Sequence, residues 1–435
     1  MTPPFVIENA HIMDPATGLD QHGALFVENG RIADIVPGRA PGVPEGCEVY
    51  DAEKAVVCPG LIDLRVFTGE PGHEYRETLA SAAEAAAAGG VTTFLVMPDT
   101  LPVIDDGALV DYLVRRAKAT AKVNILPAAA ITKGLAGTEI TEFGLLKEAG
   151  AMALSDGGHS IASAALMRAA LTYAKTFDLP VMHHTAEPEL TGNGVMNEGL
   201  LASTLGLKGI PVQAETIPLS RDLQLAGLTG ARYHAAQIST ELSVTLMAEA
   251  KRRLRTVSCG VSINNLTLNE NDVGAYRTFY KLSPPLRAEH DRQALVEGLS
   301  KGTIDVIHSS HDPQDSEVKR RPFAEASDGA IGLETLLAAA LRLVHNGDVN
   351  LMTVLRAMTS RPAEILGLKS GRLAVGAPAD FIVFDPDLPW VVDERKIVSR
   401  SRNTTFEGAR FSGRVIHTFV AGRPVFSQPE IEGML

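Results

Sequence analysis

The sequence is poor in cysteine. Its 435 residues include three cysteines, Cys47, Cys58 and Cys259, which lie far apart and form no Cys-x-x-Cys pair. An odd number of scattered cysteines is not typical of a disulfide framework or of a cysteine-ligated zinc site. We therefore expect the protein to reside in a reducing cytoplasm.

Long apolar runs and basic clusters are also missing. No run of about eighteen apolar residues occurs, which predicts no membrane-spanning helix, and the opening MTPPFVIENAHIMDP is not typical of a secretion signal. The formal charge of -12 is spread along the chain, which disfavours binding to nucleic acid or to an anionic membrane. Because 45% of the residues are hydrophobic, we expect a globular protein with a large core.

Both ends of the chain have the pattern of β-strands. Near the N-terminus, FVIENAHIM and ALFVENGRIADIV alternate in polarity, and the Asn29-Gly30 pair is typical of a hairpin turn. Near the C-terminus, ADFIVFDPD and GRVIHTFVAGRPVF have the same character. We expect residues 1–57 and 369–435 to form one small β-sandwich domain built from both termini.

The middle of the chain, residues 58–368, alternates strand patterns with helical patterns. This alternation predicts βα units and a parallel sheet. The eight strand candidates are LIDLRVF, TTFLVMP, KVNILPAAA, AMALSD, PVMHHT, RYHAAQIS, TVSCGVSI and IDVIHSS. Eight units predict an α/β fold of the (β/α)8 TIM-barrel type, with its functional site at the C-terminal ends of the strands.

Residues that could ligate a metal are sparse at these strand ends. A catalytic zinc site needs about three His or carboxylate ligands that converge on one position. Neighbouring residues of a strand face opposite sides, so only one of His183 and His184 can face the barrel interior. The remaining candidate ligands are His184, Asp156, His311 and Asp312.

Many ordered blocks of the chain resemble one family. They include PGLID at 59–63, EPG at 70–72, GGVTTFLVMPDT at 89–100, GVMNEG at 194–199, LGLKGIPVQAE at 205–215, YKLSPPLR at 280–287 and PFAEASDGAIGLET at 322–335. Over nearly its whole length the chain therefore resembles the dihydroorotase family of the amidohydrolase superfamily. The resemblance implies a metal-dependent barrel that acts on a cyclic amide in pyrimidine biosynthesis.

The resemblance fails at most of the metal-binding positions. The family's first strand supplies two histidines, and the resemblance aligns Arg65 and Phe67 with them. Its sixth-strand histidine corresponds to Gln237. Its eighth-strand aspartate, which binds metal and acts as the general base, corresponds to Ser310. Four of the six metal positions are thus changed.

The other two metal positions keep residues that can bind a metal. The resemblance aligns Asp156 with the fourth-strand ligand, although a shift by one residue would place Gly157 there. His184 corresponds to the fifth-strand histidine. With only these two positions intact, we expect no bound cofactor.

The family's substrate-binding positions are changed as well. The arginine that follows the two histidines corresponds to Gly69, and two asparagines correspond to Asp99 and Ser283. The last histidine of the eighth-strand motif corresponds to Gln314. Since dihydroorotate is an anion, losing an arginine and gaining an aspartate should cost ~2–5 kcal/mol of binding.

Three functional hypotheses follow. The resemblance extends to catalytically inactive dihydroorotase-like chains that hold the catalytic trimers of aspartate carbamoyltransferase in a larger assembly, so we expect a homo-oligomeric, non-catalytic partner of that enzyme. The alternative is a zinc-dependent cyclic amidohydrolase with a reduced site and a different substrate. The third hypothesis is a ligand-sensing protein in which Arg65 binds an anion.

Arg65 and Phe67 also have a purely structural interpretation. Arg65 would be neutralised by Asp156 or Asp63 and would occupy the space of the metals, while Phe67 would fill volume. This interpretation predicts a barrel mouth that is narrower and less acidic than in an active relative.

Overall fold

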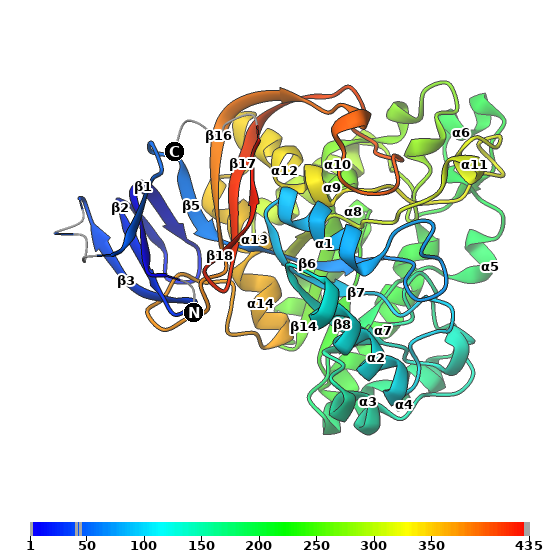
Figure 1. The fold of residues 1–435 in the computed structure, drawn as a ribbon. Coiled ribbons are helices and arrows are strands. Elements are labelled where there is room, and N and C mark those ends of the chain that lie inside the picture. The colour runs from blue at the N-terminus through cyan, green and yellow to red at the C-terminus, as the bar shows by residue number, and fades with distance from the viewer. Residues whose placement is uncertain (1–2, 40–41, 43–45, 430–435) are drawn as a thin grey trace.

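Two parts of different architecture make up the molecule. The computed structural model describes residues 3–39, 42 and 46–429. Figure 1 shows a β-sheet built from both ends of the chain beside a larger body of strands and helices. Among the described residues, no helix has the length and apolar character needed to cross a membrane.

Strands from the two ends meet, as predicted, and they form one mixed sheet. Its strand order is β18-β17-β16-β5-β1-β2-β3, with β4 also paired to β1. Asn29 and Gly30 both have positive φ in the β2–β3 turn, as this hairpin type requires. The strands are β1 (Phe5–Asp14), β2 (Leu19–Glu28), β3 (Arg31–Pro37), β4 (Glu48–Asp51), β5 (Val56–Pro59), β16 (Phe381–Val391), β17 (Arg410–Val420) and β18 (Arg423–Ser427).

This sheet curls over its own apolar face. Phe5 of β1 and Phe419 of β17 lie three strand positions apart, which is about 14 Å in a flat sheet. Their rings nevertheless stack with centroids 5.3 Å apart, and Phe381 stacks on Phe419 at 4.6 Å. The curled sheet therefore encloses its own core. The domain boundaries at 57/58 and 368/369 stay a prediction.

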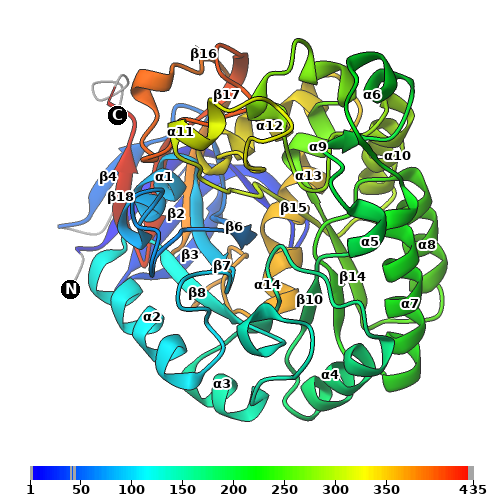
Figure 2. The same ribbon diagram turned by 90° about the vertical axis from the view of Figure 1, so that its right-hand side faces the viewer.

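The middle of the chain forms the predicted parallel barrel. Its strands follow one another in chain order around the sheet, and a bridge between Val66 and His311 brings the first and last strand together. Figure 2 shows the helices surrounding these strands. The strands are β6 (Leu61–Val66), β7 (Val91–Val96), β8 (Asn124–Ala129), β9 (Ala153–Leu154), β10 (Val181–His183), β13 (Tyr233–Ala235), β14 (Val257–Ser262) and β15 (Val306–His308).

Helices follow the barrel strands and begin at polar caps. The Asp106 carboxylate caps α2 by accepting hydrogen bonds from the backbone N–H groups of Ala108 and Leu109. The helices are α1 (Leu79–Ala88), α2 (Gly107–Thr120), α3 (Phe143–Ala149), α4 (Ala164–Thr176), α5 (Pro188–Thr191), α6 (Leu200–Leu205), α7 (Gln213–Thr229), α8 (Glu241–Lys251), α9 (Ile263–Thr267), α10 (Glu289–Ser300), α11 (Ser316–Lys319), α12 (Leu336–His345), α13 (Leu351–Met358) and α14 (Ser360–Leu366).

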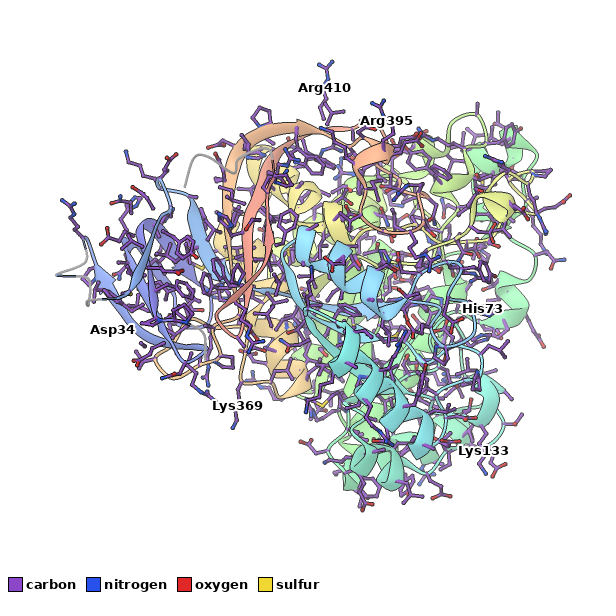
Figure 3. All side chains as sticks on the ribbon, in the orientation of Figure 1. Asp34, His73, Lys133, Lys369, Arg395 and Arg410 are labelled. Atoms are coloured by element: carbon purple, nitrogen blue, oxygen red, sulfur yellow. The ribbon has the colours of Figure 1, made fainter. Side chains whose placement is uncertain are left out.

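The C-terminal ends of the barrel strands face away from the terminal sheet. His73 lies in the loop after β6 and Lys133 in the loop after β8. Figure 3 shows both at the side of the molecule opposite Asp34, which belongs to β3. We call the region enclosed by the loops that follow the barrel strands the barrel mouth.

Candidate functional site at the barrel mouth

Arg65 lies inside the barrel and is held mainly by packing. Only 3% of it is exposed, and its guanidinium carbon lies 5.1 Å from the centre of the Phe67 ring. Its Nη1 donates one long hydrogen bond of 3.3 Å to the carbonyl of Gly157. Within the described residues its Nε has no hydrogen-bond partner. The guanidinium is therefore buried with few of its donors satisfied.

Three carboxyl groups act electrostatically on Arg65: in decreasing order those of Asp99, Asp312 and Asp63. Burial raises the pKa of Asp99 to about 6, and the nearby Arg65 charge opposes this rise. Burial also raises the pKa of Asp312 to about 7, with a further contribution from the negative charge of Asp99. The barrel mouth thus combines one guanidinium with two carboxyl groups that resist ionisation.

The expected neutralisation of Arg65 by Asp156 is wrong. Asp156 Oδ1 accepts hydrogen bonds from the backbone N–H groups of Ile131 (2.8 Å) and Thr132 (2.9 Å), and its Oδ2 accepts one of 2.6 Å from the Thr132 hydroxyl. Both oxygens are therefore committed to the loop after β8. Asp156 fastens that loop and does not face the guanidinium.

Asp63 acts on Arg65 more weakly than the sequence suggested. One Asp63 oxygen accepts a 3.0 Å hydrogen bond from the backbone N–H of Arg65, and the other accepts one of 2.9 Å from the backbone N–H of Ser309. Asp63 therefore joins β6 to the end of β15 and makes no ion pair with the guanidinium. Asp99, which was expected only as a substrate-binding position, has the largest electrostatic effect.

The two adjacent histidines point to opposite sides of β10, as predicted. His183 Nε2 accepts a 2.8 Å hydrogen bond from the backbone N–H of Ile161, so its Nδ1 carries the proton and donates to Asp222 at 2.6 Å. His184 Nε2 lies 3.5 Å from the hydroxyl of Ser283. Burial, with a contribution from the Arg65 charge, holds the pKa of His184 well below its usual value. His184 is therefore neutral.

Two of the changed metal positions are hydrogen-bonded to each other. The Ser310 hydroxyl donates to the side-chain carbonyl of Gln237 at 3.2 Å. The Gln237 amide in turn donates to the Asn265 carbonyl at 3.1 Å. A neutral chain of hydrogen bonds thus joins the ends of strands β13, β14 and β15 where the resemblance implied metal ligands.

The remaining candidate ligands are engaged elsewhere. His311 Nδ1 accepts a 3.3 Å hydrogen bond from the backbone N–H of Gly332, and its Nε2 lies 3.6 Å from Glu77. Asp312 accepts a 2.9 Å hydrogen bond from the Gln314 amide. In the described part of the chain, no three His, Cys, Asp or Glu side chains gather in a group that could hold a metal. These side chains do not fit a zinc site.

Gly69 is required by the backbone. Its φ is +81°, and a Cβ built on it would lie 2.7 Å from the carbonyl oxygen of His73. A side chain at this position would therefore need a shift of the loop. The loop as folded has no room for the arginine that the resemblance implies at this position.

A buried network around Arg287 holds the loops of the barrel mouth in place. Looking for possible metal ligands in the sequence does not reveal it, because an arginine does not bind a metal. Arg287 is 3% exposed and donates to Asn197 (3.0 Å), to the carbonyl of Ile210 (2.7 Å) and to the Ser239 hydroxyl (3.1 Å). Glu215 accepts a 2.8 Å hydrogen bond from the backbone N–H of Ser239. We call Arg287, Asn197, Glu215 and Ser239 the arginine clamp.

The arginine clamp explains three sequence blocks. Asn197 belongs to GVMNEG, Glu215 closes LGLKGIPVQAE, and Arg287 closes YKLSPPLR. The three residues share one feature that the sequence shows. Each is a charged or amide residue within a block that resembles the family, and the three blocks lie far apart in the chain. These residues hold loops in place, and this role separates them from the positions that would bind a metal.

Comparisons with known proteins identify the family to which these blocks point. Residues 54–243 match the family described as "Dihydro-orotase-like", and residues 342–426 match "Amidohydrolase family". The chain is 42% identical to a protein named dihydroorotase from Pelobacter propionicus, over 97% of this chain and 99% of that protein. It is 41% identical to a dihydroorotase from Anaeromyxobacter dehalogenans, over 98% and 99% of the two chains.

Solved structures share the fold at lower identity. An L-hydantoinase (dihydropyrimidinase) from Arthrobacter aurescens superposes with a TM-score of 0.88 at 23% identity, covering 98% of this chain and 96% of that one. A dihydropyrimidinase from Brevibacillus agri superposes with a TM-score of 0.84 at 20% identity, covering 98% and 95%. At such identities the likeness concerns the fold alone.

Proposed function

The chain belongs to the dihydroorotase family, and we propose that it is a non-catalytic member of that family. The observation that carries the proposal is the hydrogen bond between Ser310 and Gln237. These are two positions at which the resemblance implies metal ligands, and here their side chains satisfy each other. A buried guanidinium, Arg65, occupies a third position.

The family reaction needs groups that these residues do not supply. Opening or closing a cyclic amide by this route requires a metal-activated water, a Lewis acid on the carbonyl and a carboxylate that moves the proton. The serine hydroxyl at position 310 cannot serve as that carboxylate, and the guanidinium of Arg65 repels a metal cation. Losing one electrostatic stabiliser alone costs roughly 10²–10³ in rate.

The proposed role is that of a structural or regulatory partner of aspartate carbamoyltransferase in pyrimidine biosynthesis. The resemblance to inactive dihydroorotase-like chains supports this partner. The arginine clamp is compatible with this role, because it holds the loops of the barrel in place without taking part in a reaction.

The partnership can be tested by mixing the purified chain with the carbamoyltransferase of the same organism. We expect a complex that co-migrates on size-exclusion chromatography, and a change in transferase activity on mixing. Separate elution at micromolar concentrations, with unchanged transferase activity, would contradict the proposed partner. Ovalbumin, added at the same concentration as an acidic protein of similar size, controls for nonspecific association.

The alternative is a zinc-dependent cyclic amidohydrolase with an altered substrate. The names of the relatives at 41–42% identity favour it. It would require ligands that the described residues do not assemble. Metal analysis of protein purified without chelators separates the two: we expect far less than one zinc per chain, and near-stoichiometric zinc would favour the amidohydrolase.

A further inference from the structure

Two hairpin turns of the terminal sheet share one sequence pattern. The β2–β3 turn contains Asn-Gly-Arg at 29–31, and the β17–β18 turn contains Ala-Gly-Arg at 421–423. The first two residues of each turn have positive φ, from +47° to +73°, as tight hairpins of this type require. Arg31 and Arg423 therefore each begin the strand that follows their turn.

The two turns pack against each other. They adjoin β3 and β18, which are the two edge strands of the curled sheet. A Cβ built on Gly30 would lie 2.8 Å from the carbonyl oxygen of Ala421, so this contact leaves no room for a side chain. The backbone N–H of Ala379 donates to the carbonyl of Gly30, and its carbonyl accepts from the N–H of Gly422, both at 3.0 Å. Turns from opposite ends of the chain are thus fixed side by side.

A groove of about 1440 Å³ lies where these turns meet α2 and the start of β8. The basic residues that line it are Arg31, Arg423, Lys118 and Lys122. None of the described residues that line it is acidic, although the chain has 52 acidic and 40 basic residues. Its aliphatic walls include Val114, Ala117, Ala121, Leu126 and Val425. We call this cavity the basic groove.

Three of the four cations have no carboxylate partner. Among the described residues, Arg31, Arg423 and Lys118 form no ion pair. Lys122 is paired with Glu84 at 2.8 Å. The three unpaired cations come from the two turns and from α2, so three separate segments direct positive charge into one cavity.

The acidic residues beside the basic groove do not neutralise it. Asp380 is 5% exposed, and its carboxylate accepts hydrogen bonds from the backbone N–H of Ala421 (2.7 Å) and from the Asn124 amide (3.1 Å). Both of its oxygens are therefore engaged with residues of the groove wall. Glu28 is opposite Arg31 in the β2–β3 hairpin but does not line the groove. The cavity stays positively charged.

We propose that the basic groove binds the oligophosphate of a small molecule such as a nucleoside triphosphate. The planar guanidiniums of Arg31 and Arg423 present paired donors that match two oxygens of a phosphate, and Lys118 adds a point charge. Arg31 uses its Nη1 on the carbonyl of Gly376 at 2.8 Å, which leaves its other donors for a ligand. An oligophosphate carries several negative charges, so all three cations attract it at once. The aliphatic walls suit a flat ring attached to the phosphates.

The basic groove is separate from the barrel mouth. Its lining includes Asn124, Ile125 and Leu126, the first three residues of β8, so it lies towards the N-terminal ends of the barrel strands. Figure 3 shows His73 and Lys133, from the mouth loops, on the side of the molecule away from the terminal sheet. Binding in the groove therefore does not depend on the metal positions or on whether the barrel catalyses a reaction.

Isothermal titration calorimetry of the full chain with ATP, UTP and tripolyphosphate, at about 50 mM salt, tests the proposal. We expect one site per chain with a dissociation constant between about 1 and 100 µM, and weaker binding at about 300 mM salt. The double variant Arg31→Gln/Arg423→Gln should weaken binding at least about 10-fold, because two charge-assisted contacts are lost. Lys118→Gln should weaken it about threefold or more.

Arg115→Gln is the matched control. Arg115 also lies on α2, but 78% of its side chain is exposed, it pairs with Asp111 and it does not line the groove. Its loss should leave binding unchanged. Thermal unfolding of each variant checks the fold. The exposed Lys118 side chain has no hydrogen-bond partner in the described part of the chain, so Lys118→Gln tests the ligand contact without disturbing the fold.

The three ligands distinguish the possible sources of the phosphates. A nucleotide that binds at least about 10-fold more tightly than tripolyphosphate would identify a nucleoside polyphosphate, and equal affinities would identify a free oligophosphate. Both results support the site. No binding up to about 1 mM would overturn the proposal, and so would binding that the double variant and Lys118→Gln both retain, or that Arg115→Gln weakens equally. Tighter binding of hexaglutamate than of any phosphate compound would assign the groove to an acidic peptide, and would also overturn it.

Discussion

The barrel mouth and the arginine clamp each contain a buried arginine, and the two are bound very differently. Arg287 is 3% exposed and donates three hydrogen bonds of 2.7–3.1 Å. Arg65 is equally buried but donates one hydrogen bond of 3.3 Å, and its Nε has no partner among the described residues. Arg287 is part of a hydrogen-bond network, whereas Arg65 is buried with a single weak hydrogen bond.

This difference in hydrogen bonding indicates which of the two arginines the fold needs. A buried polar group that lacks a partner costs about 1–3 kcal/mol, so Arg65 depends on the Phe67 ring and on nearby carboxyl groups in place of a full set of hydrogen bonds. The arginine clamp joins three distant loops through satisfied hydrogen bonds. The clamp therefore holds the loops around the barrel mouth in place, while the mouth itself encloses a guanidinium with few hydrogen-bond partners.

The largest expected effect is a difference in the free energy of unfolding between variants of Arg287 and Arg65. Arg287→Met should lower the free energy of unfolding by about 3–5 kcal/mol, because three hydrogen-bond acceptors lose their donor and the buried Glu215 loses a nearby positive charge. Arg65→Met should lower it by about 1 kcal/mol or less, because only one weak hydrogen bond is lost. Urea unfolding followed by circular dichroism measures both. Equal losses of unfolding free energy in the two variants would contradict the contrast between Arg287 and Arg65.

A second prediction concerns Asp99, whose carboxyl Oδ1 lacks a hydrogen-bond partner within the described residues. Because burial raises its folded pKa to about 6, the folded state binds its proton more tightly than the unfolded state. Its contribution to stability is therefore complete near pH 4 and is lost as the pH rises towards 6. Asp99→Asn should stabilise the protein at pH 7.5 by on the order of 2–3 kcal/mol.

The pH dependence provides the control for this variant. At pH 4 the wild-type carboxyl is protonated and resembles the amide, so the gain should vanish. Asp387→Asn changes an 86% exposed carboxylate and should have little effect at either pH. An Asp99→Asn variant that is less stable than wild type at pH 7.5 would show that the carboxylate is needed as the partner of Arg65.

The smallest expected effect tests the hydrogen bonds among Gln237, Asn265 and Ser310. Gln237→Ala should cost about 1–2 kcal/mol, because the Asn265 carbonyl and the Ser310 hydroxyl lose their partner. Gln293→Ala, on the exposed side of α10, is the matched control and should be nearly neutral. Differential scanning calorimetry resolves the difference. A neutral Gln237→Ala would mean that this chain of hydrogen bonds contributes nothing to stability.

The barrel was predictable because strand patterns alternate with helical patterns along the middle of the chain. The division of His183 and His184 between opposite sides of β10 was predictable too, because it follows from strand geometry alone. The start of α7 was harder to predict. The sequence shows a clear helical pattern only after Pro218, but the helix begins at Gln213 and includes that proline.

A contact from another segment explains why this proline is tolerated. A proline at position 218 cannot donate to the carbonyl of Ala214. The backbone N–H of Glu187 donates to that carbonyl instead, at 2.7 Å. Such a partner, 27 residues earlier in the chain, is invisible to a pattern search.

The site could be predicted only in part. The changed positions were recognisable from residue type, because glutamine and serine are poor zinc ligands. The partners of Asp156 and Arg65 were not, because they depend on which loop approaches each side chain. Asp156 turns towards the backbone of Ile131 and Thr132, and a sequence pattern does not encode that direction.

The loop around Gly69 would limit any attempt to engineer dihydroorotase activity into this scaffold. Substituting histidines at positions 65 and 67 would place at the end of β6 the two ligands that the resemblance implies, but an arginine at position 69 would still be blocked by the carbonyl of His73. The segment from Gly69 to His73 would have to be redesigned first. A directed-evolution campaign that changes one residue at a time would therefore meet its barrier in a backbone conformation, before any question of metal affinity arises.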